Sequence, residues 1–312
     1  MNSSQKIVLP EPTSALVVNS LTLLGSDGFV LNVPELSIEQ GSIVAIIGAN
    51  GSGKTSLLEA ILGLRKAKSG DAKFRGRNLD TLVRKELGVY LQSASFEPSM
   101  LVGEILALHA SLYDHVEVNL RETLGIDELK KKTFEHCSTG QRQRVGIYLA
   151  LASRPRLSIL DEPTSGLDAS AAAAFRKHLG ETDWRSSQRT CVIVTHTDAD
   201  ARLAERVVWL NQGKIVGDGP LDALISARLG PRHLVLNHLT VDQHKSIKKA
   251  IPSGSVVRET FDGERHTIHV FGDDQFEREL LPRLQDERRL SYTASETGAE
   301  DLVLFGMQET DQ

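Results

Sequence analysis

Residues 48–55, Gly-Ala-Asn-Gly-Ser-Gly-Lys-Thr, fit the pattern G-x-x-x-x-G-K-[ST] and constrain this chain more tightly than any other stretch. The apolar residues 42–47 come directly before the pattern, and a helical run with Leu57, Leu58 and Ile61 follows it. Glycine lets backbone N–H groups point at phosphate oxygens without a Cβ clash, and a helix N-terminus adds partial positive charge. The segment therefore predicts a strand, a phosphate-binding loop and a helix that together hold a nucleoside triphosphate.

The last residues of the pattern indicate a triphosphate with its metal ion. Lys54 is expected to reach the β- and γ-phosphates, and the hydroxyl of Thr55 is expected to bind Mg²⁺. Across the loop and the first helical turn, the predicted nucleotide contacts are Gly48, Asn50, Gly51, Ser52, Gly53, Lys54, Thr55 and Ser56.

A pair of acidic residues, Asp161 and Glu162, follows the apolar strand predicted over residues 157–160. A carboxylate at the C-terminal end of a buried strand faces a ligand at that edge of the sheet. We therefore expect Asp161 to hold Mg²⁺ through water and Glu162 to polarise the attacking water as a general base.

Residues 137–144, Cys-Ser-Thr-Gly-Gln-Arg-Gln-Arg, precede a further helical run. Ser138 is expected to cap that helix, and Gly140 permits close approach of the backbone to an anion. The segment resembles the signature of the ATP-binding cassette (ABC) family, LSGGQ followed by basic residues. Ser138, Gly140 and Gln141 match it, while cysteine and threonine replace the leucine and the first glycine. In the family this segment meets the γ-phosphate held by a second subunit, so the resemblance implies nucleotide contacts by these three residues.

Other segments resemble further elements of the family, in the family's order. Gln92, after the apolar strand 88–91, resembles the Q-loop glutamine that contacts Mg²⁺ and senses the γ-phosphate. Residues 165–168 match the D-loop that crosses to the partner, and they end in Asp168. His196 follows the strand 191–195, as the switch histidine of the family does. The resemblance implies catalytic roles for Glu162, His196 and Gln92, nucleotide contact by Asp168, and metal binding by Thr55, Gln92 and Asp161.

One element departs from the family. ABC ATPases usually stack adenine on an aromatic residue ahead of the phosphate loop, whereas residues 23–29 here read Leu-Leu-Gly-Ser-Asp-Gly-Phe. Phe29 is the only aromatic residue of that stretch, and two interpretations stay open, a stacking platform or a core residue.

The resemblance spans roughly two-thirds of the chain, about residues 16–224, and implies an α/β fold for an ABC domain over residues 14–228. That domain would combine a RecA-like P-loop core, an antiparallel β subdomain and an α-helical subdomain at about residues 96–152. Residues 93–101, just after Gln92, would contact the membrane subunit of a transporter.

A smaller C-terminal accessory domain is expected over residues 232–307. Its predicted order is strand, helix, strand, strand, helix and strand, namely 234–236, 241–250, 255–260, 265–270, 274–285 and 290–294. This βαββαβ order indicates a ferredoxin-like α+β unit. His266 and His269 would lie on opposite faces of a strand, so no cluster of chemistry is expected. A structural or dimer-supporting role and a small-molecule regulatory site both stay open.

Composition and charge exclude several classes of protein. The net charge of −5 without basic blocks argues against a dedicated nucleic-acid protein. The two cysteines, Cys137 and Cys191, lack metal-type spacing and fit a reducing cytosol. No apolar run is long enough to cross a bilayer, so membrane attachment would come through another protein. We therefore expect a cytoplasmic location, peripheral on the inner face of the cell membrane through a permease.

The resemblance implies a magnesium-dependent ATPase that acts as a homodimer, or paired with a second ABC ATPase, on a separate integral-membrane permease. An exporter is favoured, because residues 298–304 are similar to the tail of ATPase subunits from ABC-2-type exporters. An importer ATPase with a regulatory C-terminal domain is the alternative. A soluble ABC ATPase acting on ribosomes or DNA usually has two cassettes or a long coiled coil, and this chain has neither. No residue predicts the cargo, which contacts the permease.

Overall fold

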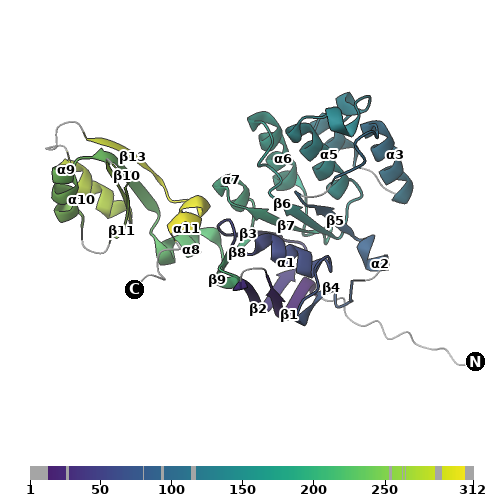
Figure 1. The fold of residues 1–312 in the computed structure, drawn as a ribbon, viewed down its shortest axis with the longest axis horizontal. Coiled ribbons are helices and arrows are strands. Elements are labelled where there is room, and N and C mark those ends of the chain that lie inside the picture. The colour runs from purple at the N-terminus through teal and green to yellow at the C-terminus, as the bar shows by residue number, and fades with distance from the viewer. Residues whose placement is uncertain are drawn as a thin grey trace, which may run out of the picture. The chain divides into compact units, whose positions relative to one another are not determined.

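The computed structural model describes residues 13–25, 28–79, 81–92, 95–113, 117–252, 255–261, 263, 265–284 and 290–305. Residues 93 and 94 of the predicted permease-contact loop lie outside this part of the chain, as do residues 253–254, 262, 264, 285–289 and 306–307 of the predicted accessory domain. Contacts divide the chain into two units (Figure 1). The first comprises Met1–Thr195 and Ala199–Val216, and the second comprises His196–Asp198 and Gly217–Gln312. The domain boundaries expected from the sequence, 14–228 and 232–307, stay a proposal.

A six-stranded sheet with the order β5-β6-β7-β3-β8-β9 forms the centre of the first unit. Its strands are β3 (Ile43–Ile47), β5 (Leu87–Tyr90), β6 (Leu157–Asp161), β7 (Thr190–Thr195), β8 (Arg206–Asn211) and β9 (Lys214–Gly219). Strands β3, β6 and β7 are buried along their whole length, as expected of parallel strands covered on both faces. The register pairs Ile47 with Thr195 and Asp161 with Val194, so these strands end at one edge. That edge therefore brings together the loops that leave β3 and β6.

The antiparallel subdomain is a three-stranded sheet with the order β2-β1-β4. It consists of β1 (Ser14–Leu24), β2 (Val30–Glu39) and β4 (Ser69–Phe74). Buried and exposed residues alternate along β2, and its buried side chains join one core with Leu57 and Leu58 of helix α1 (Lys54–Ile61). The antiparallel β subdomain implied by the resemblance is thus present, and its strands β1 and β2 are 11 and 10 residues long.

Helices of the first unit pack on the same sheet and on one another. They are α2 (Thr81–Arg84), α3 (Val102–Leu112), α4 (Val118–Thr123), α5 (Thr139–Ala152) and α6 (Ala169–Glu181), with α7 (Asp198–Ala201) where the two units join along the chain. Short 3-10 turns, η2 (Asp127–Leu129) and η3 (Phe134–His136), complete the predicted helical subdomain. Among the described residues, no helix is both long and apolar enough to span a bilayer.

Helix α5 lies directly on strand β5, because a glycine faces it. A Cβ added at Gly88 would lie 1.7 Å from the carbonyl oxygen of Ala150 in α5. We expect Gly88→Ala to lower the free energy of unfolding by about 3 kcal/mol, since a backbone clash forces helix and strand apart. The matched control is Gly180→Ala in α6, where an added Cβ meets nothing within 4 Å. Urea denaturation should show this control to be as stable as the wild type or slightly more stable. Equal stability of the two variants would contradict the close packing of α5 on β5.

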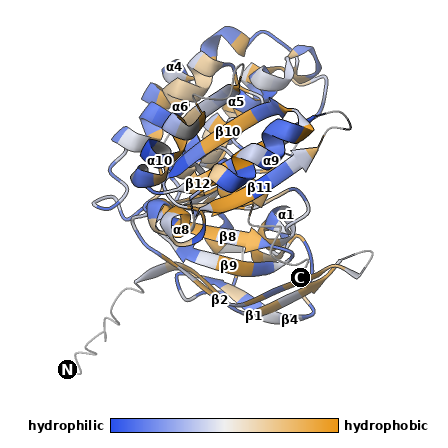
Figure 2. Ribbon diagram, turned by 90° about the vertical axis from the view of Figure 1, so that its left-hand side faces the viewer, coloured by the Kyte–Doolittle hydropathy of each residue, from blue (hydrophilic) through white to orange (hydrophobic). Residues whose placement is uncertain are grey.

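The second unit contains a four-stranded antiparallel sheet with the order β11-β12-β10-β13. Its elements are α8 (Leu221–Arg228), β10 (Arg232–Leu239), α9 (Val241–Ala250), β11 (Val256–Phe261), β12 (His266–Gly272), α10 (Asp274–Leu284), β13 (Ser291–Glu296) and α11 (Ala299–Phe305). Helices α9 and α10 pack on the apolar face of this sheet and turn hydrophilic surfaces outward (Figure 2). The order of elements and strands is that of a ferredoxin-like unit, as the sequence predicted.

The tail expected from the family resemblance folds as the short helix α11, which contacts α8. Asp198, in the short segment that follows β7, accepts a hydrogen bond from the backbone N–H of Ala299 (2.9 Å). A Cβ added at Gly298 would lie 2.8 Å from the same carboxylate. Residues 196–198 and the start of α11 therefore belong to one packed unit.

Candidate functional site

The phosphate loop has the shape that its glycines predicted. A Cβ at Gly48 would lie 2.2 Å from the carbonyl oxygen of Leu210 and 2.6 Å from Ser52 Oγ. Gly53 caps α1 with φ = 104°, a left-handed conformation that favours glycine. Ser52 Oγ is buried and has no hydrogen-bond partner within the described part of the chain. The loop thus leaves a donor and a helix N-terminus unsatisfied, which fits an anionic ligand.

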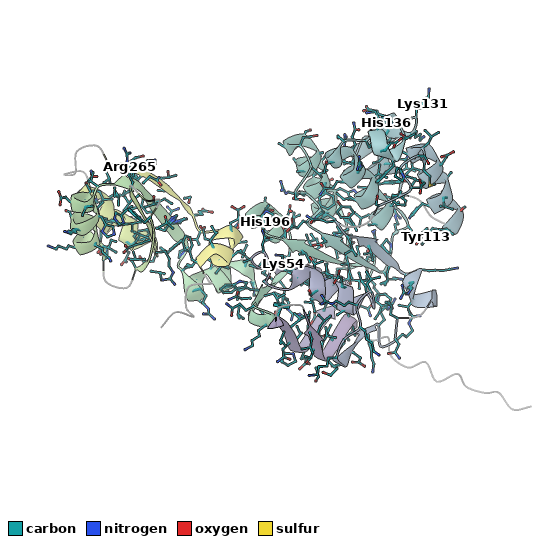
Figure 3. All side chains as sticks on the ribbon, viewed as in Figure 1. Lys54, Tyr113, Lys131, His136, His196 and Arg265 are labelled. Carbon is teal, nitrogen blue, oxygen red and sulfur yellow. The ribbon has the colours of Figure 1, made fainter. Side chains whose placement is uncertain are left out.

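Lys54, which is labelled in Figure 3, is the first residue of α1. Its side chain is buried. Its Nζ donates hydrogen bonds to the carbonyl oxygens of Gly48 (2.6 Å) and Ala49 (3.0 Å). Burial lowers the pKa of Lys54, and the charges of Glu162 and Asp161 oppose that shift. The ammonium group is therefore held over the loop, close to two carboxylates.

The acidic pair lies at the end of β6, as predicted. Burial and the neighbouring Glu162 raise the pKa of Asp161, while Lys54 and a hydrogen bond from Thr55 counteract them. Gln92 Nε2 donates a hydrogen bond to Glu162 Oε2 (3.0 Å), although the two residues are 70 positions apart. The structure thus brings together Lys54, Thr55, Gln92, Asp161 and Glu162.

Glu162 has an unusual backbone. Its φ is 48°, in the left-handed region that a glutamate rarely adopts and that costs free energy. Its N–H donates to the carbonyl oxygen of Val194 (2.8 Å), and its own carbonyl accepts from Gln143 Nε2 (2.9 Å). Strained conformations that neighbours hold in place are frequent at functional sites. Because of its left-handed backbone, the Glu162 side chain leaves the strand end in a direction that an extended backbone conformation would not allow.

Gln143 is part of this arrangement, although no motif of the sequence indicated it. The residue lies on α5, is 5% exposed, and its amide oxygen is 2.4 Å from where a Cβ at Gly166 would be. Its side chain thus connects the helix to the backbone of Glu162 and to the D-loop. A polar side chain on the buried face of a helix was the available signal, because buried amides need partners.

One cavity of about 750 Å³ unites most of the predicted residues. Gly48 and Ser52 are not part of its lining. The predicted residues that line it are Asn50, Gly51, Gly53, Lys54, Thr55, Ser56, Gln92, Asp161 and Glu162.

The cavity also has residues that fit a magnesium ion. Thr55, Gln92 and Asp161 all line it, and Thr55 donates a hydrogen bond to the Asp161 carboxylate. Hydroxyl, amide and carboxylate oxygens are the ligands that Mg²⁺ prefers, with the remaining positions filled by water and phosphate. The donor set therefore suits the predicted metal.

Phe29 lines the same cavity and is half-buried. A Cβ at Gly53 would lie 2.8 Å from its ring, and the ring packs against the core of the first unit. Phe29 thus lies at the cavity and also packs on the core, and its role as a stacking platform for adenine stays a prediction.

The signature segment lies outside the lining of this cavity. Ser138 caps α5, as predicted: Ser138 Oγ accepts from the N–H of Gln141 (3.3 Å), and Gln141 Oε1 accepts from the N–H of Ser138 (3.1 Å). A Cβ at Gly140 would lie 2.6 Å from the carbonyl oxygen of Gly166. Gly140 is therefore needed for packing against the D-loop of its own chain, a reason that the sequence did not suggest.

Two further predicted residues also lie outside the lining. Asp168 caps α6 by accepting a hydrogen bond from the N–H of Ala171 (2.9 Å). His196, which is labelled in Figure 3, directly follows β7 and is exposed. It belongs by its contacts to the second unit. Their expected contacts with nucleotide stay predictions.

The second unit holds a histidine cluster that the sequence did not lead us to expect. His233 Nε2 and His269 Nδ1 are 3.1 Å apart, and Asp301 Oδ1 lies 3.0 Å from His233 Nδ1. Phe305 of α11 packs edge-on against His233 and also contacts the ring of His269. His266 instead lies beside His244 of α9, in line with opposite faces of β12. The cluster was missed because His233 is 36 residues from His269.

We expect this cluster to make the stability of the second unit depend on pH. Burial lowers the pKa of His269, the charge of His233 adds to the shift, and Asp301 opposes it. In the unfolded chain the imidazole regains its ordinary value of 6.5, so below that pH the unfolded state binds more protons. We expect the free energy of unfolding to be greatest above about pH 6.5 and to fall as the pH drops below it, by less than about 1.4 kcal/mol per unit of pKa difference, because His269 is half-exposed and solvent screens its charge. Urea denaturation across this range should show the slope, and His269→Phe should reduce it. If the free energy of unfolding depends on pH in the same way in that variant, titratable groups other than His269 cause the dependence.

Comparisons with known proteins agree with this geometry. The family model described as "ABC transporter" matches residues 31–165. The tungstate uptake system ATP-binding protein TupC of Peptoclostridium acidaminophilum is 32% identical over 206 residues, which are 64% of this chain and 96% of that protein. The uncharacterized ABC transporter ATP-binding protein YdbJ of Bacillus subtilis is 29% identical over 296 residues, 88% of this chain and 94% of its own length.

Among solved structures, an ATP-binding subunit of an ABC transporter is 25% identical, with a TM-score of 0.60 over 69% of this chain and 93% of that one. Sequence motifs, cavity and relatives thus agree, and the chain belongs to the ABC transporter family.

Proposed function

We propose that two copies of this ABC ATPase, or this chain with a second ABC ATPase, close around ATP and energise a separate membrane permease. The observation that carries the proposal is the one cavity lined by the phosphate loop, Gln92, Asp161 and Glu162. The chain would lie at the cytoplasmic face of the membrane, held there by its permease. Acidic net charge and the absence of basic blocks in the sequence speak against nucleic acid as a partner.

The phosphate loop binds the nucleotide in this proposal. Backbone N–H groups of the loop and the N-terminus of α1 attract the phosphates, and Lys54 exchanges its carbonyl partners for phosphate oxygens. Thr55, Gln92 and Asp161 hold Mg²⁺, which neutralises charge on the phosphates when it is bound.

Hydrolysis depends on how the chain orients water. Glu162 accepts the hydrogen bond of the attacking water as a general base, and Gln92 keeps its carboxylate in place. His196 contacts the γ-phosphate from the end of β7. Most of the rate enhancement in such a site comes from positioning and charge stabilisation.

The partner subunit completes the site in this proposal. Ser138, Gly140 and Gln141 are exposed or half-exposed and do not line the cavity of their own chain. They are free to meet the γ-phosphate bound by the other copy, and Asp168 contacts that copy through the D-loop. ATP then joins the two subunits, and its hydrolysis releases them.

For the direction of transport we propose export, because residues 298–304 are similar to the tail of ABC-2-type exporter ATPases. An importer is the second candidate, because TupC is named for uptake of tungstate. TupC aligns with 64% of this chain and YdbJ with 88%. The name of YdbJ gives no direction of transport, so the relative with the larger coverage does not favour the importer over the exporter.

Two measurements test the proposal. Magnesium-dependent ATPase activity per molecule should rise with protein concentration, because each site needs two chains. If the rate per molecule does not change as the protein is diluted until the dimer dissociates, the site does not need two chains and the proposal of a paired site is wrong.

Affinity purification of the tagged chain from membranes should recover an integral-membrane protein. If that protein comes with an extracytoplasmic binding protein, the importer replaces the exporter.

A further inference from the structure

The nucleotide cavity contains a cationic flat side chain that the family resemblance does not explain. Besides the phosphate loop, Gln92 and the acidic pair, the cavity is lined by Gly25, Gly28, Phe29 and Arg65. Only Phe29 and Arg65 among these carry a flat group large enough to cover a nucleobase. Phe29 and Arg65 are therefore the two candidates among these residues for a platform on which the base of a bound nucleotide stacks.

Phe29 is enclosed by backbone on two sides. A Cβ at Gly25 would lie 3.1 Å from Phe29 Cδ1, and a Cβ at Gly53 would lie 2.8 Å from Phe29 Cζ. The ring also packs against the buried core of the first unit. Much of its surface is thus used for packing.

Arg65 is held in a fixed position instead. Its Nη2 donates to the carbonyl oxygen of Leu24 (3.2 Å), and its Nη1 lies 3.5 Å from Ser56 Oγ. A carboxylate oxygen of Glu59 is 3.8 Å from the same Nη1, and the side chain of Arg65 is 38% exposed. A guanidinium held at both terminal nitrogens keeps its plane, and such planes stack on aromatic rings and on bases.

The position of Arg65 also fits the departure from the family. Its partner Leu24, together with Gly25, stands in the stretch where the family carries its aromatic residue. Leu24 has no ring and is 51% exposed, and the guanidinium is bonded to its backbone. The chain thus has a planar cation where an aromatic ring is missing.

We propose that Arg65 is the platform for the nucleobase in this site, in place of the aromatic residue of the family. The proposal rests on the proposed function, since it presumes that the cavity binds ATP. Stacking on a guanidinium needs only the face of a base and is tolerant of base identity. ATP and GTP should therefore bind with affinities within about tenfold of each other.

Isothermal titration with four probes tests the platform: ATP, GTP, CTP and inorganic tripolyphosphate, each with magnesium. Arg65→Ala and Arg65→Lys should both weaken ATP binding by about 5- to 100-fold, because lysine keeps the charge but not the plane. Tripolyphosphate has no base, so its affinity should not change in either variant. Arg65→Tyr should restore ATP binding. Arg84→Ala, on the exposed surface of α2, is the matched control and should bind ATP as the wild type does.

Several outcomes would overturn the proposal. If Arg65→Ala weakens tripolyphosphate as much as ATP, and Arg65→Lys restores both, Arg65 acts as a phosphate-binding charge. If Phe29→Leu loses ATP affinity at unchanged melting temperature while Arg65→Ala does not, Phe29 is the platform. Failure of the wild type to bind either ATP or tripolyphosphate would instead refute the proposed function. The two failures are thereby distinguishable.

Discussion

Glu162→Gln is expected to lower the rate of ATP hydrolysis by roughly 100- to 10,000-fold while ATP binding persists. The amide keeps the size of the side chain and can still accept the hydrogen bond from Gln92, but it cannot act as a base. Because the γ-phosphate is not removed, the ATP-bound pair of subunits should accumulate. Phosphate release measures the rate, and size-exclusion chromatography with ATP measures the pair.

Glu86→Gln is the control for this substitution, since that carboxylate pairs with Arg77 on the surface (2.6 Å). Its turnover should equal that of the wild type. Wild-type turnover in Glu162→Gln would remove Glu162 from the role of base and leave its strained backbone without a functional reason.

Lys54→Met should weaken the binding of magnesium ATP by about 100-fold. The variant keeps the length and the apolar stem of the side chain but loses the ammonium group that lies close to both Asp161 and Glu162. The two carboxylates would then repel the phosphates without compensation. Titration calorimetry measures the affinity.

Lys66→Met serves as the matched control, because Lys66 is exposed and is not part of the cavity lining. It should bind ATP with wild-type affinity. Equal affinity of Lys54→Met and Lys66→Met would show that the ammonium group of Lys54 serves the loop and not the nucleotide.

The sequence predicted those parts of the site that local chemistry determines. The glycines of the phosphate loop, the acidic pair after a buried strand and the cap at Ser138 each depend on neighbours within a few residues. Each of these has the expected local geometry. The strand order of the second unit was also predictable, because βαββαβ chains have few ways to pair their strands.

The parts that were missed depend on contacts between distant segments. Gln143 reaches Glu162 across 19 residues, Arg65 reaches Leu24 across 41, and His233 reaches His269 across 36. No local pattern distinguishes these side chains from ordinary polar residues on a helix or strand. Their roles appear only when the sheets bring the segments together.

The bond between Asp198 and Ala299 has a consequence for protein engineering. A version of the chain that stops at residue 231 would lack the backbone N–H of Ala299, which donates a hydrogen bond to the Asp198 carboxylate. Asp198 would keep its place in the sequence, two residues after His196, but would lose one of its anchors. When the C-terminal domain of one relative is exchanged for that of another, residues 196–198 should therefore be exchanged with it. Both partners of the hydrogen bond between residues 198 and 299 then come from the same protein.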